Sequence, residues 1–200
     1  MPTLFDDIKV YLPKYLSEEA TVSLFRELAS FPNNIDSRMY TIKLNDEQTI
    51  FQGDGLSELW VCDLPSETRK QTRVMVLSNT CDTAPENKRL LGPRLLYCPI
   101  IRLAEYESLL RRAIISISEE HLKALRRQEI TSMMYLPENE KLGGEAVALL
   151  DRVNNCDAQN LDLSELTRTR LFTLGDYGFY LFLLKISIHF TRIREGVARS

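Results

Sequence analysis

The chain has 200 residues, 44% of them hydrophobic, which suffices for one normally packed globular unit with helical additions. Its 28 acidic and 25 basic side chains give a formal net charge of -3, so no overall positive field draws polyanions to the surface. The start of the sequence lacks the basic and apolar stretches of a secretory signal, and we therefore expect a cytoplasmic protein.

The cysteines and histidines do not indicate a metal site. The four cysteines are widely spaced, without a Cys-x-x-Cys pair, and only two histidines are available to complete a zinc set. We expect reduced, mostly buried thiols and neither a metal nor a cofactor. The sequence also lacks a P-loop, a dinucleotide-type glycine fingerprint, His-Glu-x-x-His and Gly-x-Ser-x-Gly, which disfavours nucleotide-cofactor enzymes, zinc proteases and serine hydrolases.

Residues 1–38 are predicted to form a helical segment. Apolar residues recur at helical spacing from Leu4 to Leu12, Pro13 interrupts, and Ser17 resembles the N-cap of a second helix that ends near Pro32. The second helix is expected to bury Val22, Leu24, Phe25 and Leu28.

Residues 39–165 change to short β-type runs separated by Gly, Asp, Pro and Ser. The runs cover residues 40–42, 59–62, 73–77 and 95–98 and, after a charged helical insertion at about 103–128, residues 133–136 and 146–150. Short strands with such turns predict a small barrel or a strongly twisted sheet, and the helices around them an α+β fold.

Residues 166–200 are predicted to form a C-terminal helix that packs on the barrel or on a partner. The helix is apolar nearly all round from Tyr177 to Phe190 except at Lys185, but a membrane span would need about 20 apolar residues. We therefore favour a buried helix or an oligomer contact over a membrane anchor. The nearby basic residues form either a phosphate-facing patch or a solvated face, namely Arg168, Arg170, Arg192, Arg194 and Arg199.

Short motifs in the middle section follow one another in a particular order. They are Gly53-Asp54, a strand ending in Asp63-Leu64-Pro65, a strand led by Arg73 and ending in Ser78-Asn79, and Tyr97-Cys98-Pro99-Ile100. This order resembles that of the PemK/MazF toxin family, and residues 146–157 resemble the family's valine-rich strand and following turn. The resemblance covers residues 53–100 and 133–161, under half of the chain.

The resemblance implies a small SH3-like barrel and a metal-independent endoribonuclease of a toxin–antitoxin or phage-defence system. RNA would be its substrate and an antitoxin or other protein its partner, in a homodimer or hetero-oligomer. By position Arg73 corresponds to the family's arginine, whose permanently charged fork stabilises the scissile phosphate. Ser78 and Asp82 complete the expected catalytic set, and the expected substrate-binding residues are Asn79, Thr80 and Arg102.

Two features leave other interpretations open. The run from Ser78 to Asp82 also fits an Asx-type turn that closes a strand. The family's threonine falls on Ile101, which can neither bind phosphate nor relay a proton. The alternative is therefore a catalytically inactive barrel that serves as a protein- or nucleic-acid-binding subunit of a larger complex. A third hypothesis is a scaffold that docks on another subunit through its last helix, by Tyr180, Leu181, Leu184 and Ile188.

Overall fold

The computed structural model describes residues 17–84, 86, 90–113 and 119–191. It divides into two compact units, residues 1–34 and 35–200, which are described separately. The first contains helix α2 (Glu18–Ala29), in which the carbonyl of Ser17 accepts the first helical hydrogen bond from Thr21. The predicted second helix is thus confirmed, but Val22 is 58% exposed, so the prediction that it is buried was wrong. The predicted helix from Leu4 lies outside the described residues.

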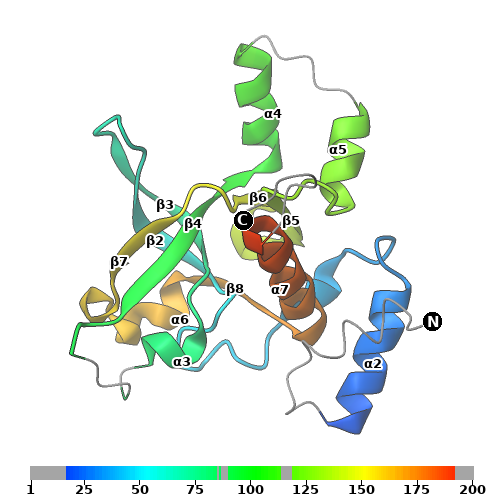
Figure 1. Cartoon of the computed structure of the whole chain (residues 1–200), viewed down its shortest axis with the longest axis horizontal. Helices are drawn as coiled ribbons and strands as arrows, with labels where there is room; N and C mark the ends of the chain where they lie inside the picture. The colour runs from blue at the N-terminus through cyan, green and yellow to red at the C-terminus, as the bar shows by residue number, and fades with distance from the viewer. Residues whose placement is uncertain (1–16, 85, 87–89, 114–118, 192–200) are drawn as a thin grey trace, which may run out of the picture. The chain divides into compact units, whose positions relative to one another are not determined.

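The second unit confirms the α+β class. An antiparallel sheet has the strand order β1-β8-β2-β3-β4-β6-β5, with β7 pairing beside β4 (Figure 1). The strands are β1 (Tyr40–Thr41), β2 (Gly55–Cys62), β3 (Arg69–Val76), β4 (Arg94–Arg102), β5 (Met133–Asn139), β6 (Gly144–Leu149), β7 (Asn154–Asp157) and β8 (Arg170–Leu174).

The ends of this sheet approach each other without joining. Within the part of the chain that the structure describes, β1 pairs only with β8 and β5 only with β6. The Tyr40 hydroxyl of β1 donates to the carbonyl of Pro137 in β5 at 2.8 Å, so a side chain spans the gap. The barrel predicted from the sequence is therefore not closed.

Two hydrophobic clusters form part of the core, and alternate side chains of β3 and β4 pack into the first of them. One cluster joins β2, β3 and β4 to α6 (Leu166–Thr169), and its buried members are Ile50, Leu56, Leu59, Val74, Val76, Leu95, Tyr97 and Leu166. The other lies under α4 (Leu103–Arg112) and α5 (Glu119–Arg126), with Leu103, Tyr106, Leu125, Tyr135 and Val147. The helical insertion between β4 and β5 thus packs on β5 and β6 through this second cluster.

Helix α7 (Asp176–Thr191) is buried in its first half. Tyr180 and Leu181 are 3% and 7% exposed, whereas Ile188 is 49% exposed. Gly178 is required for the close packing of this helix, because a Cβ atom there would lie 2.1 Å from the carbonyl oxygen of Met39. No helix among the described residues is long and apolar enough to span a membrane. Three arginines of the predicted basic patch, Arg192, Arg194 and Arg199, lie outside those residues.

The remaining elements are short. They are the α-helix α3 (Thr80–Thr83) and the 3-10 helices η1 (Ser37–Met39), η2 (Glu140–Leu142), η3 (Ala158–Asn160) and η4 (Leu163–Glu165).

Candidate functional site: a groove between a hairpin and helix α4

Ser78, predicted as a catalytic residue, links two strands. Its hydroxyl accepts a hydrogen bond from the backbone N–H of Leu96 at 2.7 Å and donates to the carbonyl of Arg94 at 3.2 Å. The residue is only 9% exposed. Both hydrogen-bonding directions of the hydroxyl are therefore used to fasten the end of β3 to β4.

Asn79 and Thr80, predicted to bind substrate, also make structural contacts. The side chain of Asn79 accepts from the backbone N–H of Cys81 at 2.9 Å and caps α3, which confirms the Asx-type turn. The Thr80 hydroxyl accepts from the backbone N–H of Gln52 at 2.9 Å. Asp82, the predicted base, lies on the exposed side of the same short helix.

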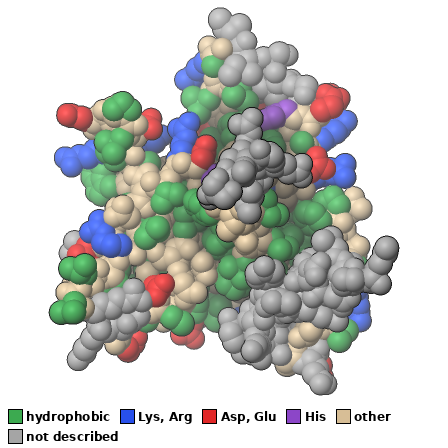
Figure 2. Space-filling model, in the orientation of Figure 1, with side chains coloured by type: hydrophobic (Ala, Val, Ile, Leu, Met, Phe, Trp, Pro, Cys, Tyr) green, Lys and Arg blue, Asp and Glu red, His purple; other side chains and the backbone are tan. Residues whose placement is uncertain are grey.

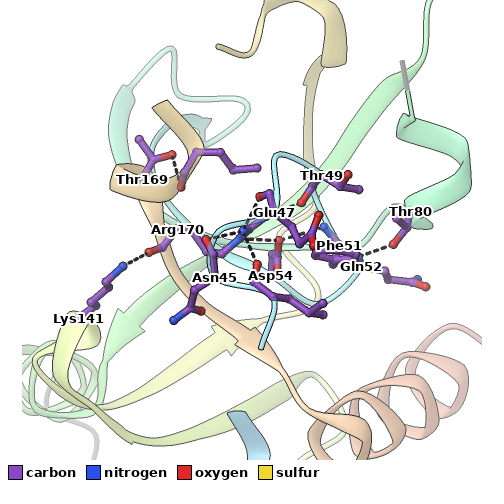
Figure 3. A network of polar contacts seen from close by, with 12 residues as sticks. Asn45, Glu47, Thr49, Phe51, Gln52, Asp54, Thr80, Lys141, Thr169 and Arg170 are labelled. Carbon is purple, nitrogen blue, oxygen red and sulfur yellow. Dashed lines mark hydrogen bonds and ion pairs between the residues drawn. The ribbon is translucent and has the colours of Figure 1, made fainter. Parts of the chain in front are cut away.

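A buried arginine organises the segment that precedes β2 (Figure 3). The Arg170 guanidinium donates to the carboxylate of Asp54 at 3.2 Å. It also donates to four backbone carbonyls, those of Leu44, Asn45, Glu47 and Thr49. Arg170 is 1% exposed, so it is not part of a phosphate-facing patch.

Asp54 of the Gly-Asp motif is the acidic partner in this network. Its Oδ2 also accepts from the backbone N–H of Phe51 at 2.9 Å. Burial raises the pKa of this carboxyl, while the Phe51 N–H, the nearby Thr173 hydroxyl and Arg170 act in the opposite direction. Oδ1 of Asp54 and the hydroxyl oxygen of Thr173 are both buried, and neither reaches the geometry of a hydrogen bond. The motif is therefore structural in this chain.

Arg73 and Arg102 both act on Glu105, the first by its charge and the second by a hydrogen bond. Arg102 donates to Glu105 through Nε at 2.8 Å, and this bond, with a contribution from the Arg73 charge, lowers the pKa of Glu105. Arg73 lies in β3 and Ser78 lies two residues beyond its end, so five residues of largely extended chain, about 16 Å if fully extended, separate them. The structure thus separates the predicted phosphate-binding arginine from the other predicted catalytic residues.

A groove of about 470 Å³ lies between the β2–β3 hairpin and α4. The hairpin and α4 stand apart in Figure 1, and their outer ends are separated on the surface in Figure 2. The groove is lined by Val61, Cys62, Asp63, Ser66, Thr68, Lys70, Thr72, Pro99, Ile101, Tyr106, Leu109, Leu110, Met133, Leu149, Asp151, Arg152 and Asn154.

Apolar side chains line the interior of the groove, and charges of both signs lie at its rim. Ile101, at the position of the family's threonine, lines it together with the buried Pro99. Lys70 and Arg152 are balanced by Asp63 and Asp151. Such a surface suits a protein segment, because apolar contacts are combined with polar edges and no single charge dominates.

The outer edge of β2 is fastened to the body of the sheet. The Tyr97 hydroxyl donates to the carbonyl of Trp60 at 2.5 Å, and Cys62 donates its backbone N–H to Oδ1 of Asn154 at 2.8 Å. Burial raises the pKa of Tyr97 to about 12, so its hydroxyl keeps its proton at neutral pH. These contacts fix the wall of the groove that the hairpin provides.

A second hollow, of about 450 Å³, lies between β2 and residues 156–169. Its rim carries Arg168, which forms ion pairs with Glu58 at 2.9 Å and with Glu165 at 2.7 Å. Glu58 sits at a β-bulge with a positive φ of 67°. Because Arg168 is engaged by two carboxylates, it does not offer a free cation to phosphate.

No protein-family model matches the chain, and comparison with curated proteins finds no similar sequence. Among the described residues, no group of three or more His, Cys, Asp and Glu side chains is placed to hold a metal ion. The groove residues Lys70, Thr72 and Arg152 were missed in the sequence. The one signal that could have indicated them is the polar run Arg69-Lys70-Gln71-Thr72 within a strand.

Proposed function

We propose that this chain is a divergent PemK/MazF-like protein with an SH3-like sheet that serves as a non-catalytic binding subunit and holds a segment of a protein partner in the groove. The observation that carries this proposal is that the predicted catalytic residues lie apart or are used in structural contacts. Arg73 lies within β3, five residues before Ser78, which follows the end of that strand. Ser78 is fully engaged within the sheet, and Ile101 lines an apolar groove.

The chemistry of RNA cleavage requires groups that act on one phosphate. A base must remove the 2′-hydroxyl proton, a cation must stabilise the phosphorane, and an acid must protonate the leaving oxygen. Arg73 has Arg102 and Glu105 as its charged neighbours, whereas Asn79 and Thr80 are used in backbone contacts. This arrangement favours binding over endoribonuclease activity, which would belong to a toxin–antitoxin or phage-defence effector.

The first test compares cleavage and binding in cells that encode the chain. A photo-crosslinking residue replaces Thr72, which lines the groove, or Gln71, which neighbours it on the opposite face of β3. We expect covalent protein adducts from position 72 and not from position 71, with unchanged 5′ ends of total RNA. New RNA ends that depend on the protein and disappear in Arg73→Ala would overturn the proposal in favour of a ribonuclease.

A second candidate function, single-stranded nucleic-acid binding, is favoured by Trp60. This side chain is 54% exposed on the hairpin, and the Arg69 guanidinium lies 5.6 Å from its ring centre. Exposed aromatic rings beside arginines stack bases and hold phosphates. Trp60 is the chain's single tryptophan, so its fluorescence reports directly on stacking. Salt-sensitive quenching by oligouridylate would support this function, and unchanged fluorescence would exclude stacking at Trp60.

A further inference from the structure

One edge of the hairpin is closed by the protein's own side chains, and the other is open. On the β2 side, the outward-pointing backbone groups of Trp60 and Cys62 are engaged by Tyr97 and Asn154. On the β3 side, pairing with β4 begins only at Val74, opposite Pro99. Within the described residues, no strand pairs with residues 69–72 on that side.

The register of the hairpin identifies which backbone groups are open. The N–H of Asp63 donates to the carbonyl of Thr68, so these two residues form a hydrogen-bonded pair. Hydrogen-bonded pairs recur at every second residue of an antiparallel ladder, which assigns Lys70 and Thr72 to bonds with β2. The N–H and C=O groups of Arg69, Gln71 and Arg73 therefore point away from β2. Pro99 has no N–H, so its pairing with Val74 is of the non-hydrogen-bonded kind, and the adjacent bond joins the carbonyl of Arg73 to the N–H of Ile100. The open groups are thus those of Arg69 and Gln71.

These open groups border the groove. Lys70 and Thr72, the neighbours of Gln71, line it from β3, and Leu110 lines it from α4. The four residues from Arg69 to Thr72 offer an edge about 13 Å long, which matches an extended peptide of about four residues. An exposed strand edge beside a pocket is the geometry by which sheets accept an added peptide strand.

The side chains around the edge define the chemistry of the occupant. Every second side chain of an added strand would face the apolar lining formed by Ile101, Met133 and Leu149. The charge of Lys70 disfavours unspecific strand pairing at this edge, as lysines on exposed strand edges commonly do. Because the rim carries both charges, the ends of the peptide are polar rather than strongly acidic or basic.

We propose that the groove captures an extended peptide segment of alternating apolar and polar residues, which adds to β3 as a strand through the backbone of Arg69 and Gln71. This proposal rests on the proposed binding function and specifies its partner. Because the β2 edge is fastened, β3 is the side of the hairpin on which pairing is completed.

The experiment uses the full chain and a phage-displayed library of random peptides of about eight residues, enough to cover the edge. The best peptide is synthesised, and its affinity is measured by fluorescence anisotropy. Thr72→Trp, which fills the groove, is expected to weaken binding about tenfold or more, whereas Ile42→Trp, at an exposed position that does not line the groove, is expected to change it less than about twofold. Thermal unfolding checks that both variants are folded.

Backbone N-methylation of the peptide, one position at a time, distinguishes strand addition from other modes of peptide binding in the groove. Only every second peptide N–H pairs with β3, so alternate positions are expected to lose about tenfold in affinity. Slowed hydrogen exchange at the Gln71 amide in the complex gives an independent readout.

The other outcomes separate this inference from the proposed function. A peptide that is blocked by Thr72→Trp but insensitive to alternate methylation overturns strand addition and leaves groove binding intact. Failure to select any groove-dependent peptide also overturns the inference, and the crosslinking experiment then decides the proposed function alone. A dimer formed through two β3 edges, seen by mass in solution, would assign the edge to a second copy of the chain and contradict a peptide partner.

Discussion

Nε of Arg170 lies 3.2 Å from Oδ2 of Asp54, although 116 positions separate the two residues in the sequence. Their side chains are only 2% and 0% exposed. Removing one member of such a pair leaves the other charge buried and uncompensated, which destabilises proteins by about 3–5 kcal/mol. We expect this loss for Arg170→Met in urea unfolding. Arg168→Met, which removes an exposed arginine with two acidic partners, should lose much less, because solvent screens its ion pairs. Equal losses would contradict the assigned role of Arg170.

Ser78→Ala should weaken the fold rather than a reaction. The substitution leaves the backbone N–H of Leu96 without its acceptor in a largely buried site, which costs about 1–3 kcal/mol. The measurement is the free energy of unfolding, with Ser66→Ala as the exposed control, expected to change it by less than about 0.5 kcal/mol. A Ser78→Ala protein of unchanged stability that loses a measurable activity would restore a catalytic role.

Stability should depend on pH through Lys185. Burial lowers the pKa of this side chain from 10.5 to about 8, and its ammonium group contacts the carbonyl of Gln128. Between these pH values the unfolded chain binds more protons than the folded one, so the free energy of unfolding rises with pH from 8 to 10.5. The gain should reach about 3 kcal/mol. The difference in the free energy of unfolding between wild type and Lys185→Met isolates the contribution of Lys185. A difference that does not change with pH would contradict the prediction.

The four thiols should react in a fixed order. Cys62 and Cys81 are exposed, Cys98 is buried, and Cys156 is intermediate. Burial raises the pKa of both Cys98 and Cys156. We therefore expect maleimide to label Cys62 and Cys81 first, Cys156 more slowly and Cys98 only on unfolding, as followed by mass spectrometry. A groove-bound peptide should protect Cys62, which lines the groove, and leave Cys81 unchanged.

The strands that the sequence predicted are those rich in β-branched and aromatic residues. The run from Leu59 to Cys62 and that from Arg73 to Leu77 were found because Val, Trp and Met favour pleated, half-buried positions. β7, with the sequence Asn-Asn-Cys-Asp, was missed because such residues favour turns. β7 pairs with Arg94 to Tyr97 of β4, and this pairing depends on tertiary contacts that local sequence propensity does not predict.

The candidate site was harder to predict than the fold. Ser78 to Asp82 drew attention because several reactive side chains follow one another, yet the same residue types are those that cap helices and close turns. Arg170 looked like a surface cation, and its burial depends on carbonyls of residues 44–49 that approach only in the folded chain. The groove is formed by elements far apart in sequence, so no local sequence pattern predicts the hollow itself.

The hydrogen bonds from Tyr97 to Trp60 and from Cys62 to Asn154 also bear on the kinetics of recognition. A hairpin held at its rear edge keeps the groove formed before any partner arrives, so encounter does not wait for the protein to rearrange. The entropy lost on association falls mainly on the incoming chain, and stiffening that chain is the direct way to tighter complexes. Differences in affinity between partner sequences should accordingly appear in their residence times.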